Sequence, residues 1–378
     1  MLYWLLYRVL RVYVPPFRVF QYITTRVALA SLTALFLSLA LGPWVIRKLR
    51  EMSFGQHIRE DGPKSHHKKA GTPTMGGVLI LGSIVVPTLL WTDLSGPYVW
   101  IALLGLVGFG AVGFIDDYSK ITRKRNLGLT ARKKFWAQVA VAMTVGVLLL
   151  MLHQKDQYST AVNVPFFKQF HPQLLIDGLT SNFWTYPLAF VPFYIFIVFI
   201  MVGSSNSVNL TDGLDGLATG LMVVASGAMT ALAYVSGNVK LAEYLDLARL
   251  QNSGELAVFC GSMMGASLGF LYYNCHPAEM FMGDVGSLSL GGAMGVVSVL
   301  IKQEVLLIFI GGIFVLEALS VILQVGSYKL RGGKRIFKMA PIHHHFEALG
   351  WPESKVIVRF WIAGLVMALF ALTTLKLR

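Results

Sequence analysis

Long apolar runs recur along the whole sequence, and they restrict what this chain can fold into. They are about 18 to 22 residues long, which is what a helix needs to cross a hydrocarbon core of roughly 30 Å. Runs such as 78–91 and 141–152 do not alternate between apolar and polar residues, as the strands of a membrane barrel do. With 55% hydrophobic and 13% charged residues, the chain has too little polar surface for soluble domains of its size. The sequence therefore predicts an all-α integral membrane protein.

The run lengths predict about ten transmembrane helices within a single polytopic membrane domain, residues 1–378. Segment 1–20 is not counted as a span, because Arg8, Arg11 and Arg18 interrupt its apolar residues. We expect it to lie in the membrane interface. An even number of spans places both ends of the chain on one side. The expected spans are 24–46, 73–92, 97–115, 135–152, 184–203, 214–235, 255–273, 286–301, 305–327 and 355–375.

Lysine and arginine are concentrated in alternate connections between the expected spans. Three connections are dense in these residues, whereas those on the other side hold few. By the positive-inside rule, the dense connections are cytoplasmic. The net charge of +13 is thereby assigned to loops beside the membrane, and no nucleic-acid partner is expected. The dense connections are 47–70, 116–134 and 328–355.

Two further cytoplasmic connections, 204–213 and 274–285, have a different composition. They hold no lysine or arginine but contain asparagines, aspartates and glycines. Acidic and amide side chains among cationic loops are typical of a site for a metal ion and a phosphorylated substrate. The sequence therefore predicts a cytoplasm-facing active-site cleft beside these connections.

Five aspartates are the candidates for chemistry at this cleft. Asp116 and Asp117 are expected to end the third span, where they repel each other unless a cation lies near; a solvated helix end explains them equally well. Asp284 lies at the expected membrane surface, where an acid is costly unless it is paired or metal-bound. Asp212 and Asp215 belong to a glycine-rich turn that suits close approach of an anionic ligand, with helix N-capping as the alternative.

Three consecutive histidines, His343 to His345, lie in the last cytoplasmic connection. Consecutive side chains point in different directions on a regular backbone, so a zinc site made by all three is not expected. Binding of diphosphate oxygens, aided by basic residues nearby, is the better interpretation. Lys69 precedes the second span, where it either contacts substrate or only sets the topology.

Together these stretches resemble the polyprenyl-phosphate N-acetylhexosamine-1-phosphate transferases, and within them the phospho-N-acetylmuramoyl-pentapeptide transferase (MraY) family. The resemblance runs nearly end to end. The triple histidine followed by Phe-Glu favours the muramoyl branch over the N-acetylglucosamine relatives. The stretches that carry the resemblance are Thr72–Gly77, Asp116-Asp117, Asn206–Gly216, Phe281–Ser287 and His343–Glu347.

The resemblance implies ten helices, both termini in the periplasm, a homodimer in the bacterial inner membrane, and a cytoplasmic cleft open to the inner leaflet. It also implies the reaction. UDP-N-acetylmuramoyl-pentapeptide and undecaprenyl phosphate would give UMP and lipid I in the first membrane step of peptidoglycan synthesis, with Mg²⁺ as cofactor. Nucleoside antibiotics target this family and would use the same pockets.

Carried over residue by residue, the resemblance also implies site roles. The catalytic set would be Asp116, Asp117, Asp284 and His343, with Asp284 as the Mg²⁺ ligand and the aspartate pair near the carrier phosphate. The uracil ring would be bound by Lys69, Gly213, Leu214, Asp215 and Phe281. The adjoining pocket would be lined by Thr74, Asn209 and Asp212. Substrate oxygens would be held by Asn274, His343, His344 and His345.

The chemistry favours direct attack by the carrier's phosphate oxygen on the phosphorus bonded to the sugar, because a phosphate monoester is mostly dianionic at neutral pH. Asp116 would orient that phosphate and remove any residual proton. A covalent phospho-aspartate intermediate is the rival mechanism. Transfer of N-acetylglucosamine phosphate and transport of an anionic solute are the alternative functions. A transporter should have polar breaks near mid-bilayer, whereas the acids here lie at span ends.

Overall fold

The computed structural model describes residues 1–52, 71–122, 128–165, 167, 170–179, 186–245, 250 and 253–375. These residues are mostly helical, and the bridge between Ala161 and Gln173 stands outside any strand. The long helices are α1 (Ile23–Glu51), α2 (Gly77–Trp91), α3 (Pro97–Thr122), α4 (Ala131–His153), α6 (Val191–Thr211), α7 (Leu217–Gly237), α9 (Ser253–Asn274), α10 (Gly283–Leu300), α12 (Gly312–Leu330) and α14 (Glu353–Thr373). The short ones are η1 (Trp4–Val9), η2 (Leu10–Val12), η3 (Pro15–Gln21), η5 (Asp177–Leu179), α5 (Tyr186–Ala189), α8 (Val239–Tyr244), α11 (Leu307–Ile310) and α13 (Ile342–Ala348).

Nine of the described helices are long and apolar enough to cross a membrane, and α2 is a shorter apolar helix of 15 residues. The nine and α2 together give the ten crossings that the run lengths predict. The stretch before α2 is not helical, but its backbone is paired within the protein: Gly76 N donates to Phe281 O at 2.9 Å, and Gly77 N donates to Met282 O at 2.9 Å. Irregular backbone at membrane depth requires such internal partners. The predicted fold class, an all-α multi-pass membrane protein, is confirmed.

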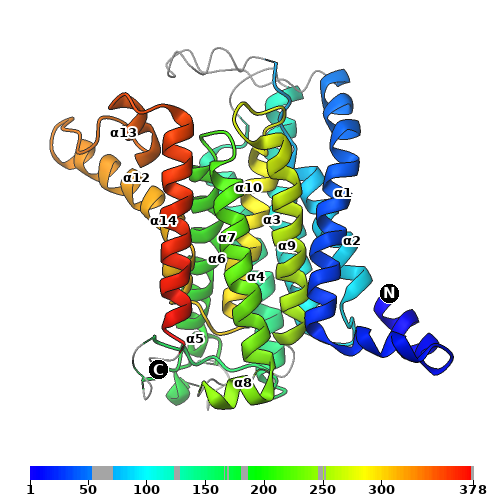
Figure 1. Ribbon diagram of the computed structural model, residues 1–378. Coiled ribbons are helices and arrows are strands. Elements are labelled where there is room, and N and C mark those ends of the chain that lie inside the picture. Colours follow the sequence, from blue (N-terminus) through cyan, green and yellow to red (C-terminus); the bar gives the residue numbers. More distant parts are fainter. Residues whose placement is uncertain are drawn as a thin grey trace.

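The expected ninth span is divided in the structure. α11 ends at Ile310, and α12 begins at Gly312 in a new direction. Figure 1 shows α12 leaning away from the bundle, with α13 above it and next to α14. Apolar side chains on α12, such as Leu319 and Ile322, are exposed, as expected of a helix that faces lipid.

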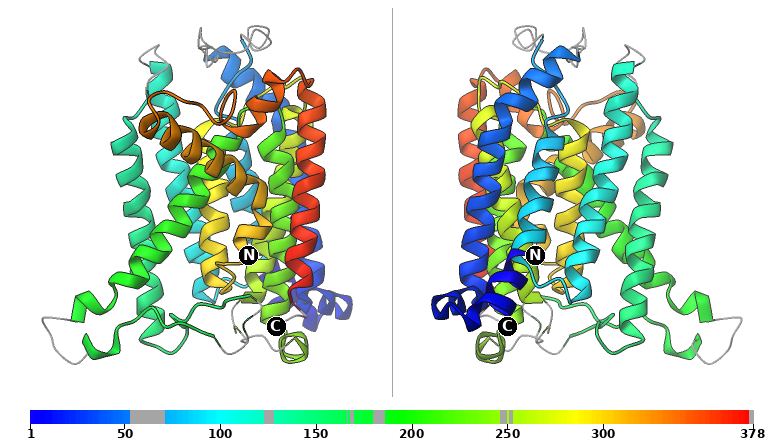
Figure 2. Two further views of the ribbon diagram at one scale, coloured as in Figure 1. Left: turned by 90° about the vertical axis from the view of Figure 1, so that its left-hand side faces the viewer. Right: turned by 90° about the vertical axis from the view of Figure 1, so that its right-hand side faces the viewer.

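Both chain ends lie toward the same end of the bundle (Figures 1 and 2), as an even number of crossings requires. The short helices η1 to η3 extend sideways from the bundle at that end. α3 ends and α10 begins at the opposite end. The acidic residues of these two helix termini are therefore far from the chain ends.

α10 is the central helix, and all of its residues from Val285 to Leu300 are buried. Small residues allow this close packing. A Cβ atom on Gly113 of α3 would collide with the carbonyl oxygen of Asp284, and one on Gly77 of α2 would collide with the backbone nitrogen of Gly286. α2 and α3 therefore contact the first turn of α10 through backbone, which sets the position of Asp284.

Two helices continue further than the sequence suggested. The connections 116–134 and 204–213 were expected to begin where apolar character ends, but α3 runs to Thr122 and α6 runs to Thr211. The polar side chains of these last turns have partners on neighbouring elements. Asn206, for example, donates to Gln138 Oε1 at 2.8 Å. Because such pairs satisfy the polar groups, the helices do not need to end where hydropathy falls.

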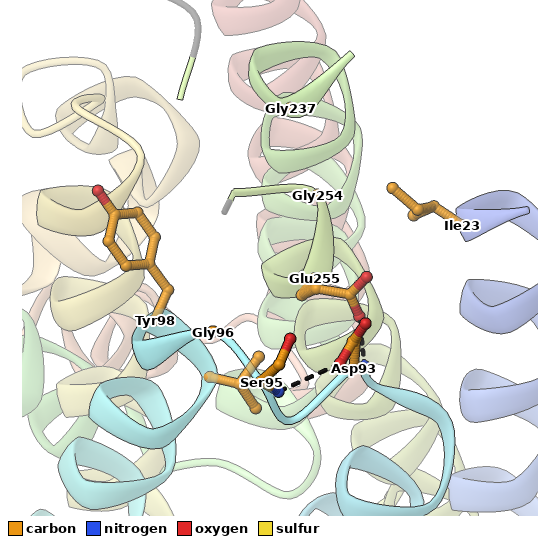
Figure 3. A pocket seen from close by; sticks show the side chains of 9 residues that line it. Ile23, Asp93, Ser95, Gly96, Tyr98, Gly237, Gly254 and Glu255 are labelled. Carbon is orange, nitrogen blue, oxygen red and sulfur yellow. Dashed lines mark hydrogen bonds between the residues drawn. The ribbon is translucent and has the colours of Figure 1, made fainter. Parts of the chain in front are cut away.

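A separate polar cavity of about 210 Å³ lies at the end of the bundle that holds the chain termini. Figure 3 shows Asp93 and Glu255 side by side in its lining. Glu255 is held by the backbone N–H of Asp93 at 2.8 Å and by two hydrogen bonds from Arg26 at 2.6 and 2.7 Å. This ion pair joins α1 to α9 and leaves the buried guanidinium with a charged partner.

Candidate active site

Three carboxylates converge where α3 ends and α10 begins. Asp116, Asp117 and Asp284 each offer an oxygen, and these atoms lie within 4.8 Å of one another. Glycines permit the approach. Gly283 has φ +71°, and a side chain there would contact the Asp117 carboxylate, while Gly113 lies against the Asp284 backbone. We call these three acids the carboxylate cluster.

Two lysines neutralise much of the negative charge of the carboxylate cluster. Lys120 Nζ lies 2.7 Å from Asp116 Oδ2, 3.1 Å from Asp117 Oδ1 and 2.7 Å from Asp284 Oδ2. Lys134 Nζ of α4 lies 2.9 Å from Asp284 Oδ2. Sequence reasoning missed both lysines. Lys120 follows the two acids at helical i+4 and i+3 spacing, which is a usable signal, whereas nothing local to Lys134 indicates its role.

Neutral donors hold the remaining carboxylate oxygens. Asn209 Nδ2 donates to Asp284 Oδ1 at 2.6 Å, the backbone N–H of Val285 donates to Asp117 Oδ2 at 3.2 Å, and that of Leu129 donates to Asp116 Oδ1 at 2.7 Å. These contacts fix each carboxylate in direction. Oxygen donors from several carboxylates are the ligands that Mg²⁺ prefers, so the residues present fit such an ion.

Asp212 follows α6 directly and adds a fourth acid nearby. The pKa of its carboxyl is raised to about 8, because desolvation disfavours the charged form and the negative charges of Asp284, Asp117 and Asp215 add to the effect.

A second polar cluster lies beside the first. His276 Nδ1 is 3.3 Å from Asp215 Oδ2 and 3.6 Å from Glu353 Oε2. Glu353 also accepts from the backbone N–H of Asp215 at 3.1 Å. This hydrogen bond ties the glycine-rich turn to the start of α14. Leu214, which precedes Asp215, is buried in the apolar core.

The three histidines point toward different partners, as expected. His343 is fully buried, with Nδ1 3.1 Å from Glu317 Oε2 and Nε2 against Gly213. His344 Nδ1 lies 2.7 Å from Glu347 Oε2, and His345 Nδ1 accepts from the backbone of Lys338 at 3.1 Å. Glu317 is a buried acid within α12 that sequence reasoning missed, although an acid inside an apolar run signals function.

The remaining predicted residues lie around the same region. Phe281 pairs its backbone with the stretch before α2, since its N–H donates to Pro73 O at 2.9 Å. This pairing brings Thr74 close to Gly283. Asn274 is buried; its oxygen accepts from Thr219 at 2.7 Å and its amide donates to Met280 O at 2.9 Å, so it supports the turn before α10. Lys69 lies outside the described residues.

Comparison with known proteins shows the family to which the chain belongs. A model of glycosyl transferase family 4 matches residues 99–302, which include the whole carboxylate cluster. The phospho-N-acetylmuramoyl-pentapeptide-transferase signature 1 matches residues 69–81. Proteins named phospho-N-acetylmuramoyl-pentapeptide-transferase are similar over the full length of both chains: 67% identical in Solibacter usitatus, 63% in Koribacter versatilis and 54% in Thermodesulfovibrio yellowstonii. The chain belongs to the phospho-N-acetylmuramoyl-pentapeptide-transferase family.

Proposed function

We propose that the protein transfers phospho-N-acetylmuramoyl-pentapeptide from its UDP donor to undecaprenyl phosphate, giving lipid I and UMP in peptidoglycan synthesis. The carboxylate cluster carries this proposal, because its three acids and two lysines form a charged site at the end of a membrane-spanning bundle. Full-length similarity to relatives with this name favours the muramoyl donor over N-acetylglucosamine donors and over transport.

The site suits a reaction between two anions, in which positioning and charge neutralisation determine the barrier. Asp284 would hold Mg²⁺, with Asp116 and Asp117 beside it. When bound, the ion neutralises charge on the phosphate oxygens. Among the described residues, Lys120 and Lys134 are cations that lie within reach of phosphates bound at the cluster.

The phosphate oxygen of the carrier attacks the phosphorus bonded to the sugar, that phosphorus loses its bond to UMP, and UMP leaves as a stable anion. Asp116 orients the carrier and accepts any residual proton. The backbone N–H of Leu129 donates to Asp116 Oδ1 at 2.7 Å and fixes this carboxylate in direction, which supports an orienting role over a covalent phospho-aspartate.

The nucleotide would lie beside the glycine-rich turn. In this proposal Lys69, Gly213, Leu214, Asp215 and Phe281 form the uracil pocket. Thr74, Asn209 and Asp212 line the adjoining pocket, and Asn274 with His343, His344 and His345 hold substrate oxygens. The contact of Asn209 with Asp284 supports a shared pocket for the nucleotide phosphates and the cluster.

The protein would work as a homodimer in the bacterial inner membrane, with the carboxylate cluster facing the cytoplasm and both termini in the periplasm. The positive-inside rule supports this orientation, because the three connections dense in lysine and arginine lie at the cluster end. The same pockets would bind nucleoside antibiotics.

The test is an assay of the purified protein in detergent with undecaprenyl phosphate, Mg²⁺ and one UDP-sugar at a time. UMP release from UDP-N-acetylmuramoyl-pentapeptide, and far less from UDP-N-acetylglucosamine, is the expected result. Release from only the N-acetylglucosamine donor would reassign the donor. Release from neither would contradict a transferase.

A further inference from the structure

The ammonium of Lys120 occupies the centre of the carboxylate cluster. It lies within 3.1 Å of an oxygen of Asp116, Asp117 and Asp284 at once. The side chains of the three acids are 4%, 4% and 15% exposed, whereas that of Lys120 is 34% exposed. The acids are thus fixed and buried, while the lysine reaches them from the more open side.

This arrangement differs from an ordinary surface ion pair, which contributes little and involves one acid. Three carboxylates so close together repel strongly when ionised in a partly desolvated place, and a nearby cation relieves this repulsion. Lys120 supplies one from the same helix as two of the acids. Its ammonium also contacts the oxygens that the proposed divalent ion would use.

We propose that Lys120 is the built-in counterion of the carboxylate cluster, and that its ammonium and the divalent ion compete for the same oxygens. Without metal, Lys120 keeps the three acids together. When the ion binds, the ammonium leaves the cluster and lies next to it, where it contacts phosphate oxygens of the substrates. This inference rests on the proposed function, since it takes the cluster as the metal site.

Lys134 provides a matched comparison. It contacts the cluster through one oxygen, Asp284 Oδ2 at 2.9 Å, and it belongs to a different helix, α4. Competition should therefore be strong for Lys120 and weak for Lys134. If the two lysines acted only through their positive charge, removing either one would change metal binding by a similar factor.

The first test measures Mn²⁺ binding to the purified protein by electron paramagnetic resonance, which reports free and bound ion without activity. Lys120→Met should lower the apparent Kd by about tenfold or more, because the competing cation is gone. Lys134→Met should lower it by a smaller factor. Asp284→Asn should abolish the binding and serves as the site control.

The outcomes separate the inference from the function on which it rests. Equal Mn²⁺ binding by wild type and Asp284→Asn would remove the metal role of the cluster. Binding by wild type that Lys120→Met leaves unchanged or weakens would overturn the role of Lys120 alone.

A second test uses wild type, in case Lys120→Met does not fold. Lysines are acylated with and without saturating Mn²⁺, and the rate at each lysine is measured by mass spectrometry. Lys120 should react several-fold faster with the metal, because its ammonium is released, while exposed Lys240 on α8 should not change. An unchanged or slower rate at Lys120 would overturn the inference.

Discussion

Single residues around Asp284 show how acids can lie together at the end of a membrane-spanning bundle. Asp284 receives two lysines and one asparagine amide, so its charge is compensated from three helices. Asp117 is compensated in part by a backbone N–H of α10. Such convergence holds the carboxylates in fixed directions, which is what a site for a cation and phosphates requires.

Substitution of Asp116 tests the proposed mechanism. In Asp116→Asn the amide cannot accept a proton, but a carrier phosphate that is fully dianionic at high pH has none to give. We expect near-normal turnover at pH 9, little loss at neutral pH where the carrier phosphate is already mostly dianionic, and a growing deficit toward pH 5, measured as UMP release. Inactivity at every pH would mean that Asp116 does more than orient the carrier and take a proton.

Asp212 gives folding stability a pH dependence. Its pKa is raised from 3.8 to about 8, so between these values the folded protein keeps a proton that the unfolded chain has lost. Stability therefore falls as pH rises through this window. Asp212→Asn should melt at a higher temperature than wild type, by a margin that grows toward about pH 8 and then levels off. Thermal unfolding in EDTA at several pH values measures this difference in melting temperature. A difference that does not change with pH would contradict the raised pKa of Asp212.

Sequence reasoning singled out three acids that the structure brings together but missed the lysines that pair with them. Asp116, Asp117 and Asp284 stand out because charges are rare beside apolar runs. Lys134 does not, because its role depends on which helices become neighbours, whereas Glu317 was missed although an acid inside an apolar run is a usable signal. Asn274 looked like a ligand for substrate, yet its amide has partners inside the protein. The roles of these residues toward substrate stay predictions.

At the scale of helices, the contact between α3 and α10 determines the geometry of the cluster. Gly113→Ala places a methyl group against the Asp284 carbonyl, which should separate the two helices and displace Asp284 from Asp116. We expect transfer to fall by about tenfold or more, since small displacements of reacting groups are costly, together with a lower melting temperature.

Gly82→Ala on α2 is the matched control for this change. A Cβ atom at Gly82 meets nothing within 4 Å, so activity and melting temperature should stay close to wild type. Normal activity of Gly113→Ala would mean that the cluster tolerates a different spacing of α3 and α10.

Run length predicted the helices well and their ends poorly. Hydropathy falls at Asp116 and at Asn206, but helical hydrogen bonding continues because those side chains find partners on Leu129, in the connection before α4, and on Gln138 of α4. The break at Gly311 was also missed, because both α11 and α12 are apolar. The helix ends and this break depend on which elements pack together, and only the structure reveals that packing.

The whole molecule has one orientation in the membrane, and its two cysteines report it. Cys275 is exposed in the connection 274–285, and Cys260 is buried in α9. A membrane-impermeant maleimide should label Cys275 in inverted vesicles but not in intact spheroplasts, with Cys275→Ser as the control. Labelling in intact spheroplasts would place the carboxylate cluster on the outer side.

The most direct test of the account follows UMP and lipid I together, using UDP-N-acetylmuramoyl-pentapeptide and undecaprenyl phosphate with wild type and Asp284→Asn. Wild type with Mg²⁺ should form both products in equal amounts. Asp284→Asn, or wild type in EDTA, should be slower by about a hundredfold or more, with the melting profile showing that the variant is folded. Full activity of Asp284→Asn would contradict the carboxylate cluster as the centre of the reaction.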